Sequence, residues 1–140
     1  MSGLKTADTK VIPKPMPKRV LVVEDSSEMA EAMKLTLAQH GYQVEVAVDG
    51  REALKRFKPG HYDLVITDYN MPRMNGVEMA EIIRRRASDQ PIMMVTAFAF
   101  TIAAFDGRPL PVDHVLHKPF KPEELEHAVN DAFTKTRRCR

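Results

Sequence analysis

A valine-rich run, RVLVVE at residues 19–24, constrains the fold of this chain more than any other feature. Strands with one wet face alternate apolar and polar residues, whereas strands of a parallel sheet are covered on both faces and read as continuous apolar runs. Apolar residues then recur at helical spacing from Met29 to Leu37, and Ser26 or Ser27 can cap the start of that helix. The run and the helix after it therefore indicate the first strand–helix unit of a parallel sheet.

The same alternation of strand and helix continues along the chain. Further strands are expected at 43–47, 63–67, 92–95 and about 113–116, and further helices at about 50–58, 75–87 and from Pro122 to about Thr134. Because strands linked through helices lie parallel, this order predicts an α/β fold with a doubly wound sheet and helices on both faces. A fourth helix, before the last strand, is expected to be short or irregular, because Gly107, Pro109 and Pro111 interrupt residues 100–113.

Length and charge indicate one domain with two flanking segments. With 140 residues, of which 44% are hydrophobic, the chain can bury one sizeable core. Prolines at alternate positions before Lys18 predict a flexible arm over 1–17, followed by a globular domain over 18–134 and a basic tail over 135–140. The net charge of +2 comes from the arm and the tail and leaves the domain acidic, so no direct nucleic-acid binding is expected.

Membrane and disulfide-rich classes are both disfavoured. No apolar run approaches the roughly 20 residues that span a bilayer, and the first residues lack the apolar core of a secretion signal. We therefore expect a soluble, cytoplasmic protein without a membrane partner. Cys139 is the single cysteine, which excludes a disulfide scaffold and cysteine-rich metal sites.

Chemically active side chains stand where the predicted strands end. The first strand ends at Glu24 and Asp25, the third leads to Asp68, the fourth to Thr96 and the fifth to Lys118. In open parallel sheets, ligands bind outside the carboxyl ends of the strands, where the strand order reverses. We therefore expect three carboxylates, a hydroxyl and an ammonium group to share one rim of the sheet.

This set of groups favours magnesium and phosphoryl chemistry. Three converging carboxylates repel one another unless a cation joins them, and Mg²⁺ prefers oxygen ligands. With that ion present, Asp68 can act as a nucleophile on a phosphoryl group, Lys118 can neutralise charge on the transferring oxygens, and Thr96 can donate its hydroxyl. The backbone carbonyl of Asn70, two residues beyond Asp68, can complete the metal shell.

These residues resemble a known family, the receiver domains of two-component response regulators, of which the chemotaxis regulator is the single-domain example. The motifs that carry the resemblance are VLVVEDS (20–26), DYNMPRMNG (68–76), VTA (95–97) and HKPF (117–120), in the family's order and spacing. The resemblance covers about residues 18–134. It implies a flavodoxin-like fold with five strands in the order 2-1-3-4-5.

Position by position, the resemblance implies a role for each residue at a strand end. Asp68 matches the phospho-acceptor, and Glu24 and Asp25 match the acidic pair that binds magnesium. Thr96 resembles the switch hydroxyl. Lys118 resembles the phosphate-contacting lysine, whose peptide bond to the following proline is commonly cis in the family.

The implied function is a stand-alone signalling switch rather than a turnover enzyme. A histidine kinase or a phosphotransfer protein would phosphorylate Asp68, and the receiver would then contact a protein partner. Two alternatives stay open. One is a pseudo-receiver that binds a partner without taking phosphate. The other is a phosphatase of the haloacid dehalogenase type, against which Asn70 argues because that family has a second aspartate at this position.

Two departures from the family pattern bear on the surface that contacts partners and on the lifetime of the phosphorylated state. Val115 stands three residues before Lys118, where many members carry an aromatic residue that moves inward on activation. Phe98 lies two residues beyond Thr96, at a place that borders the phosphoryl group in the family. Two interpretations stay open: a large ring there would hinder the hydrolytic water and prolong the phosphorylated state, or Phe98 packs with Phe100 and Phe105 as part of the core. Together with the interrupted segment 100–113, Val115 predicts an unusual output surface.

Overall fold

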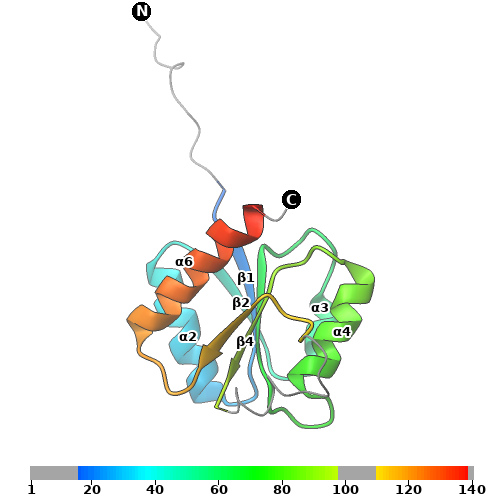
Figure 1. Ribbon diagram of the computed structural model, residues 1–140. Coiled ribbons are helices and arrows are strands. Elements are labelled where there is room, and N and C mark those ends of the chain that lie inside the picture. The colour runs from blue at the N-terminus through cyan, green and yellow to red at the C-terminus, as the bar shows by residue number, and fades with distance from the viewer. Residues whose placement is uncertain (1–15, 98–109, 139–140) are drawn as a thin grey trace, which may run out of the picture.

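The computed structural model describes residues 16–97 and 110–138, and it has one sheet at its centre (Figure 1). Five parallel strands follow the order β2-β1-β3-β4-β5, which confirms the expected topology. The strands are β1 (Arg19–Val23), β2 (Gln43–Ala47), β3 (Leu64–Asp68), β4 (Ile92–Thr96) and β5 (His114–His117). In register, Val23 lies beside Thr67, and Asp68 lies beside Val95. The central strands therefore end nearly level, at one edge of the sheet.

Two layers of helices cover the sheet, as a doubly wound fold requires. On one face lie α2 (Ser27–Gln39) and α6 (Pro122–Arg138), and on the other lie α3 (Gly50–Arg56) and α4 (Gly76–Arg86) (Figure 1). Side chains of β3 alternate between the layers: Val65 belongs to the core under α3 and α4, whereas Leu64 and Ile66 belong to the core under α2 and α6. Burial on both faces explains the continuous apolar runs of the central strands.

Side chains at the carboxyl edge of the sheet fix the starts of three helices. Ser26 caps α2 by accepting the backbone N–H of Met29, and Asp49 caps α3 in the same way. Asn75 and Glu78 cap α4 reciprocally, each side chain accepting a backbone N–H of the other residue. Because each cap stands in a loop that leaves the carboxyl end of a strand, capping also holds the loops around this edge.

Some element bounds differ from the expected ones. Asp68 is the last residue of β3 rather than part of the following loop, because it still pairs with Val95 of the neighbouring strand. Thr96 likewise completes β4 opposite His117. The last helix continues beyond Thr134, since no glycine or proline follows to end it.

Three predicted features fall wholly or largely outside the described residues. Phe98 and most of the interrupted segment 100–113 belong to residues 98–109, and most of the predicted arm belongs to residues 1–15. Among the helices of the described part of the chain, none has the length and apolar content needed to cross a bilayer.

Candidate functional site

Three carboxylates meet at the carboxyl edge of the central strands. Glu24 and Asp25 follow β1 directly, and Asp68 ends β3. One oxygen from each residue lies within 4.8 Å of the others. Glu24 is 3% exposed and Asp68 is 8% exposed, whereas Asp25 is open to solvent. The structure thus brings the predicted acidic set together and buries two of its members.

Lys118 supplies a cation to this acidic set from β5. Its Nζ lies 3.3 Å from Asp68 Oδ2 and 3.7 Å from Glu24 Oε1. The lysine is held at its backbone, because its N–H donates to the carbonyl of Thr96 at 3.0 Å, and its bond to Pro119 is cis. The predicted lysine therefore reaches both buried carboxylates from a strand that is not adjacent to theirs.

The neighbours of the buried Glu24 carboxyl shift its pKa in opposite directions. Burial raises its pKa above the usual value, and the neighbouring charges of Asp68 and Asp25 act in the same direction. The backbone N–H of Ser26, which donates to Glu24 Oε2 at 3.1 Å, and the Lys118 ammonium oppose that rise. In the described part of the chain, Lys118 thus pairs with two of the three carboxylates, so the cluster favours further positive charge.

The two remaining predicted residues occupy the expected strand and loop. Thr96 is the last residue of β4, at the same edge of the sheet as Asp68, and it is 1% exposed. Asn70 is exposed in the loop after β3. That the backbone carbonyl of Asn70 is a metal ligand remains a prediction.

The backbone of Asp68 is held by two residues to which the sequence reasoning assigned no role. Thr67 is fully buried and donates its hydroxyl to the Asp68 carbonyl at 2.8 Å. Gly76, at the start of α4, lies so close that an added Cβ would collide with the same carbonyl oxygen. Its N–H donates to the carbonyl of Tyr69 at 2.8 Å. For Thr67, the sequence did offer a signal, because it is a threonine inside an otherwise apolar strand.

The donor set fits a magnesium ion. Hard divalent cations prefer oxygen ligands, and a carboxylate cluster with a buried member of raised pKa favours added positive charge. Mg²⁺ keeps several waters and needs few protein ligands, which suits a site with one exposed member, Asp25. Glu24, Asp25 and Asp68 are the described residues that would hold it.

Sequence comparison assigns this chain to one family. The family model of the response regulator receiver domain matches residues 20–130, which contain every predicted site residue. The chain belongs to the response regulator receiver domain family. The family consists of signalling switches of two-component systems rather than of classical enzymes.

Individual relatives agree with the family assignment. Two curated relatives are the transcriptional regulatory protein DltR of Streptococcus agalactiae, 37% identical over 107 residues, and the response regulator MprA of Mycolicibacterium vanbaalenii, 39% identical over 110 residues. The alignments cover 76% and 79% of the receiver domain chain but 48% of each relative. The chain therefore spans about half the length of these curated relatives.

Solved structures of similar proteins share its architecture. TrrA of Thermotoga maritima, solved in complex with Mg²⁺-BeF, is 36% identical with a TM-score of 0.74, over 82% of this chain and 98% of that one. The chemotaxis response regulator CheY4 of Vibrio cholerae is 34% identical with a TM-score of 0.75, over 83% of this chain and 98% of that one.

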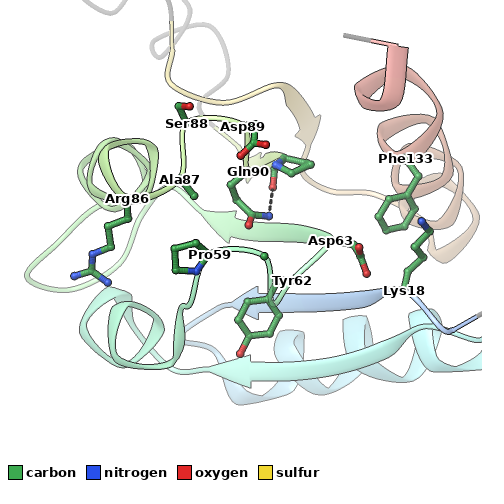
Figure 2. Close-up of a pocket in the computed structure, with 12 residues that line it drawn as sticks. Lys18, Pro59, Tyr62, Asp63, Arg86, Ala87, Ser88, Asp89, Gln90 and Phe133 are labelled. Atoms are coloured by element: carbon green, nitrogen blue, oxygen red, sulfur yellow. Dashed lines mark hydrogen bonds between the residues drawn. The ribbon is translucent and has the colours of Figure 1, made fainter. Parts of the chain in front are cut away.

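A pocket lies far from this rim, at the amino edge of the sheet (Figure 2). Its volume is about 620 Å³, and residues between the helix ends and the strand starts line it. Among the charged residues there, Asp63 and Asp89 are exposed, and Lys18 is exposed with its ammonium 5.5 Å from the ring centre of Phe133. None of the predicted site residues lines this pocket.

Two histidines near the rim do not form a shared metal site. His114 and His117 stand three residues apart on β5, so their side chains point to opposite faces of the sheet. Val115 lies between them and is 39% exposed, at the position that differs from the aromatic residue of the family pattern.

Proposed function

We propose that this receiver domain accepts a phosphoryl group on Asp68 and passes the change on by contact with a protein partner. The observation that carries the proposal is the contact of Lys118 Nζ with Asp68 Oδ2 at 3.3 Å, inside a buried acidic rim. Burying charged groups costs free energy, so buried carboxylates that are paired with a specific cation are typical of functional sites. The second buried carboxylate, Glu24, has a raised pKa at the same place.

The proposed reaction is a phosphoryl transfer from a histidine kinase or a phosphotransfer protein. A carboxylate oxygen of Asp68 forms a bond to phosphorus while the bond from phosphorus to the donor nitrogen breaks. The Lys118 ammonium then holds phosphoryl oxygens, and the Thr96 hydroxyl at the neighbouring strand end donates to another. Attack by water later releases phosphate and restores the Asp68 carboxylate.

Mg²⁺ is the cofactor that we propose for this step. Glu24, Asp25, Asp68 and the Asn70 carbonyl would hold it. When bound, the ion supplies positive charge that offsets the negative charge of the transferring phosphoryl oxygens. The relative TrrA, 36% identical, was solved with Mg²⁺-BeF, which supports the choice of ion.

Adduct formation tests the proposal. The purified protein is incubated with Mg²⁺ and beryllofluoride, and bound fluoride is observed by ¹⁹F NMR. We expect a bound signal for the wild type, none for Asp68→Asn, and a normal signal for Asp89→Asn, which changes an exposed aspartate at the opposite edge. No signal for the wild type would favour the pseudo-receiver, which binds a partner without taking phosphate.

The phosphatase alternative makes a different prediction. Such an enzyme would release phosphate from simple esters over many turnovers, with a second aspartate two residues beyond the nucleophile as general acid. Asn70 stands there instead. We expect no sustained release of phosphate from p-nitrophenyl phosphate, and sustained release that needs Asp68 would support the phosphatase.

Stand-alone signalling by protein contact is part of the proposal. DltR and MprA are regulators about twice as long as the matched region, and the acidic domain between the basic flanking segments gives no reason to expect direct nucleic-acid binding. Pull-down with wild type and Asp68→Asn, each with and without phosphodonor, tests this. A partner that is retained only by the phosphorylated wild type is the expected result, and equal retention by all four samples would contradict phosphorylation-dependent contact.

A further inference from the structure

Thr67, the residue before the proposed phospho-acceptor, brings a hydroxyl into an apolar layer. It is 0% exposed and lies on the face of β3 that also carries Val65, toward α3 and α4. A valine would fill that layer with nearly the same shape. A buried hydroxyl costs free energy unless it has a hydrogen-bond partner, so the identity of its partner indicates what it contributes.

The partner is the backbone of Asp68. Thr67 Oγ1 donates to the Asp68 carbonyl oxygen at 2.8 Å, and the Met71 sulfur at 4.0 Å is a weaker second neighbour. The same carbonyl oxygen lies against Gly76, whose N–H donates to the carbonyl of Tyr69 at 2.8 Å. The Asp68–Tyr69 peptide is therefore held by Thr67 within the strand, and Gly76 packs against its carbonyl and bonds the next carbonyl, that of Tyr69, from the start of α4.

This peptide joins the residue that carries the acceptor carboxylate to the loop that carries Asn70. Without the bond from Thr67 Oγ1, the backbone of Asp68 would be free to shift and could carry its carboxylate away from the Lys118 ammonium, which lies 3.3 Å from Oδ2. Such a shift would also displace the carbonyl of Asn70, the next residue but one. Catalytic groups lose efficiency when their supporting contacts allow shifts of this kind.

We propose that Thr67 is a positioning residue for the phosphorylation of Asp68. Its hydroxyl locks the Asp68–Tyr69 peptide in the orientation that keeps the carboxylate on Lys118 and the following loop at the rim. The proposal rests on the proposed phosphorylation of Asp68, but the locked peptide itself is a property of the unphosphorylated protein and can be measured separately.

Two substitutions separate the hydroxyl from the packing. Thr67→Val removes the hydroxyl and keeps the shape, whereas Thr67→Ser keeps the hydroxyl and removes a methyl group. Thr134→Val is the matched control, because Thr134 Oγ1 also donates to a backbone carbonyl, that of Asn130 at 3.1 Å, on remote α6. Urea unfolding of each variant shows whether it is folded before its chemistry is compared.

The first readout is phosphorylation by acetyl phosphate with Mg²⁺, followed by intact-mass spectrometry. We expect Thr67→Val to lower the second-order rate constant by roughly three- to tenfold, the value of one hydrogen bond. Thr67→Ser and Thr134→Val should react like the wild type. Equal rates for Thr67→Val and wild type, or a loss in Thr67→Ser as large as in Thr67→Val, would overturn the positioning role.

The second readout does not need phosphate. Amide hydrogen exchange at Tyr69 and Asn70 should be faster in Thr67→Val than in wild type and unchanged in Thr134→Val, because the freed peptide opens more often. Unchanged exchange in Thr67→Val would overturn the inference even if the rate fell. If the wild type takes no phosphate while exchange still responds to Thr67→Val, the proposed function fails and the locked peptide stands.

Discussion

At the carboxyl edge of the sheet, Glu24 and Asp68 are buried within reach of a single ammonium group. At the amino edge, Asp63 and Asp89 are exposed beside a pocket of about 620 Å³. The charged groups of the first edge are buried and close to one another, whereas Asp63 and Asp89 at the second are exposed beside a pocket. Under the proposed function, buried and converging charge marks the reactive edge of this fold, and the pocket at the amino edge does not.

The largest expected effect is on the rate of phosphorylation. It compares the removal of one lysine at each edge, Lys118 at the carboxyl edge and Lys18 at the amino edge. Lys118→Met removes the ammonium beside Asp68 and should slow phosphorylation by acetyl phosphate about 10²- to 10³-fold, as when other groups that stabilise developing charge are removed. Lys18→Met, at the amino edge, should leave the rate unchanged. Quenched-flow sampling with mass spectrometry measures both. Similar losses in the two variants would break the distinction between the edges.

The next comparison is between two glycine-to-alanine substitutions, one at each edge of the sheet. In Gly76→Ala the new Cβ meets the Asp68 carbonyl, so we expect the free energy of unfolding to fall by about 3 kcal/mol, the upper end of overpacking costs. Gly60→Ala, in the lining of the amino-edge pocket, meets nothing within 4 Å and should cost only about 1 kcal/mol for its φ of +80°. Urea denaturation would refute the crowding argument if Gly60→Ala proved the more damaging change.

Magnesium should stabilise the fold through one edge alone. At about ten times its dissociation constant, Mg²⁺ should raise the free energy of unfolding by about 1.4 kcal/mol. Asp25→Asn should abolish most of this gain, and Asp89→Asn should retain it. Thermal unfolding with and without MgCl₂ measures the gain, and equal stabilisation of both variants would place the ion elsewhere.

The smallest effect concerns acid stability away from the carboxyl edge. The Tyr62 hydroxyl donates to Glu45 Oε1 at 2.6 Å, and this bond, helped by His61 and Arg56, lowers the pKa of the Glu45 carboxyl below its usual 4.5. A lowered folded pKa gives stability that is present above 4.5 and lost as pH falls through the folded value.

Tyr62→Phe should therefore be less stable than the wild type by up to about 1 kcal/mol near neutral pH, because the carboxylate is partly exposed. The gap should close as the pH falls below 4.5. Urea midpoints across the pH range measure it. A gap that is the same at all pH values would show that the hydroxyl does not act through the Glu45 charge.

The positions of the main site residues could be predicted from the sequence, because the end of a strand is visible there as the end of an apolar run. Glu24 and Lys118 stand just beyond such ends, and parallel pairing forces those ends together whatever the side chains do. The five-stranded order required the family resemblance as well, since periodicity alone does not say which strands are neighbours.

The contacts that hold the site residues in place could not be predicted in the same way. Asp68 was expected in a loop, because an aspartate after an apolar run reads as a turn, whereas pairing with Val95 extends the strand by one residue. The contacts of Thr67 and Gly76 with one carbonyl oxygen depend on a close approach between β3 and α4. Such an approach leaves no periodic trace in a sequence.

Locating the phosphoryl group tests the central claim most directly. The protein is incubated with acetyl phosphate and Mg²⁺, the acyl phosphate is reduced with borohydride, and peptides are sequenced by mass spectrometry. A homoserine at position 68, and an unmodified Asp89 at the opposite edge, is the predicted result. A peptide that retains unmodified Asp68 under conditions that phosphorylate another receiver domain, or modification at a different aspartate, would contradict the account.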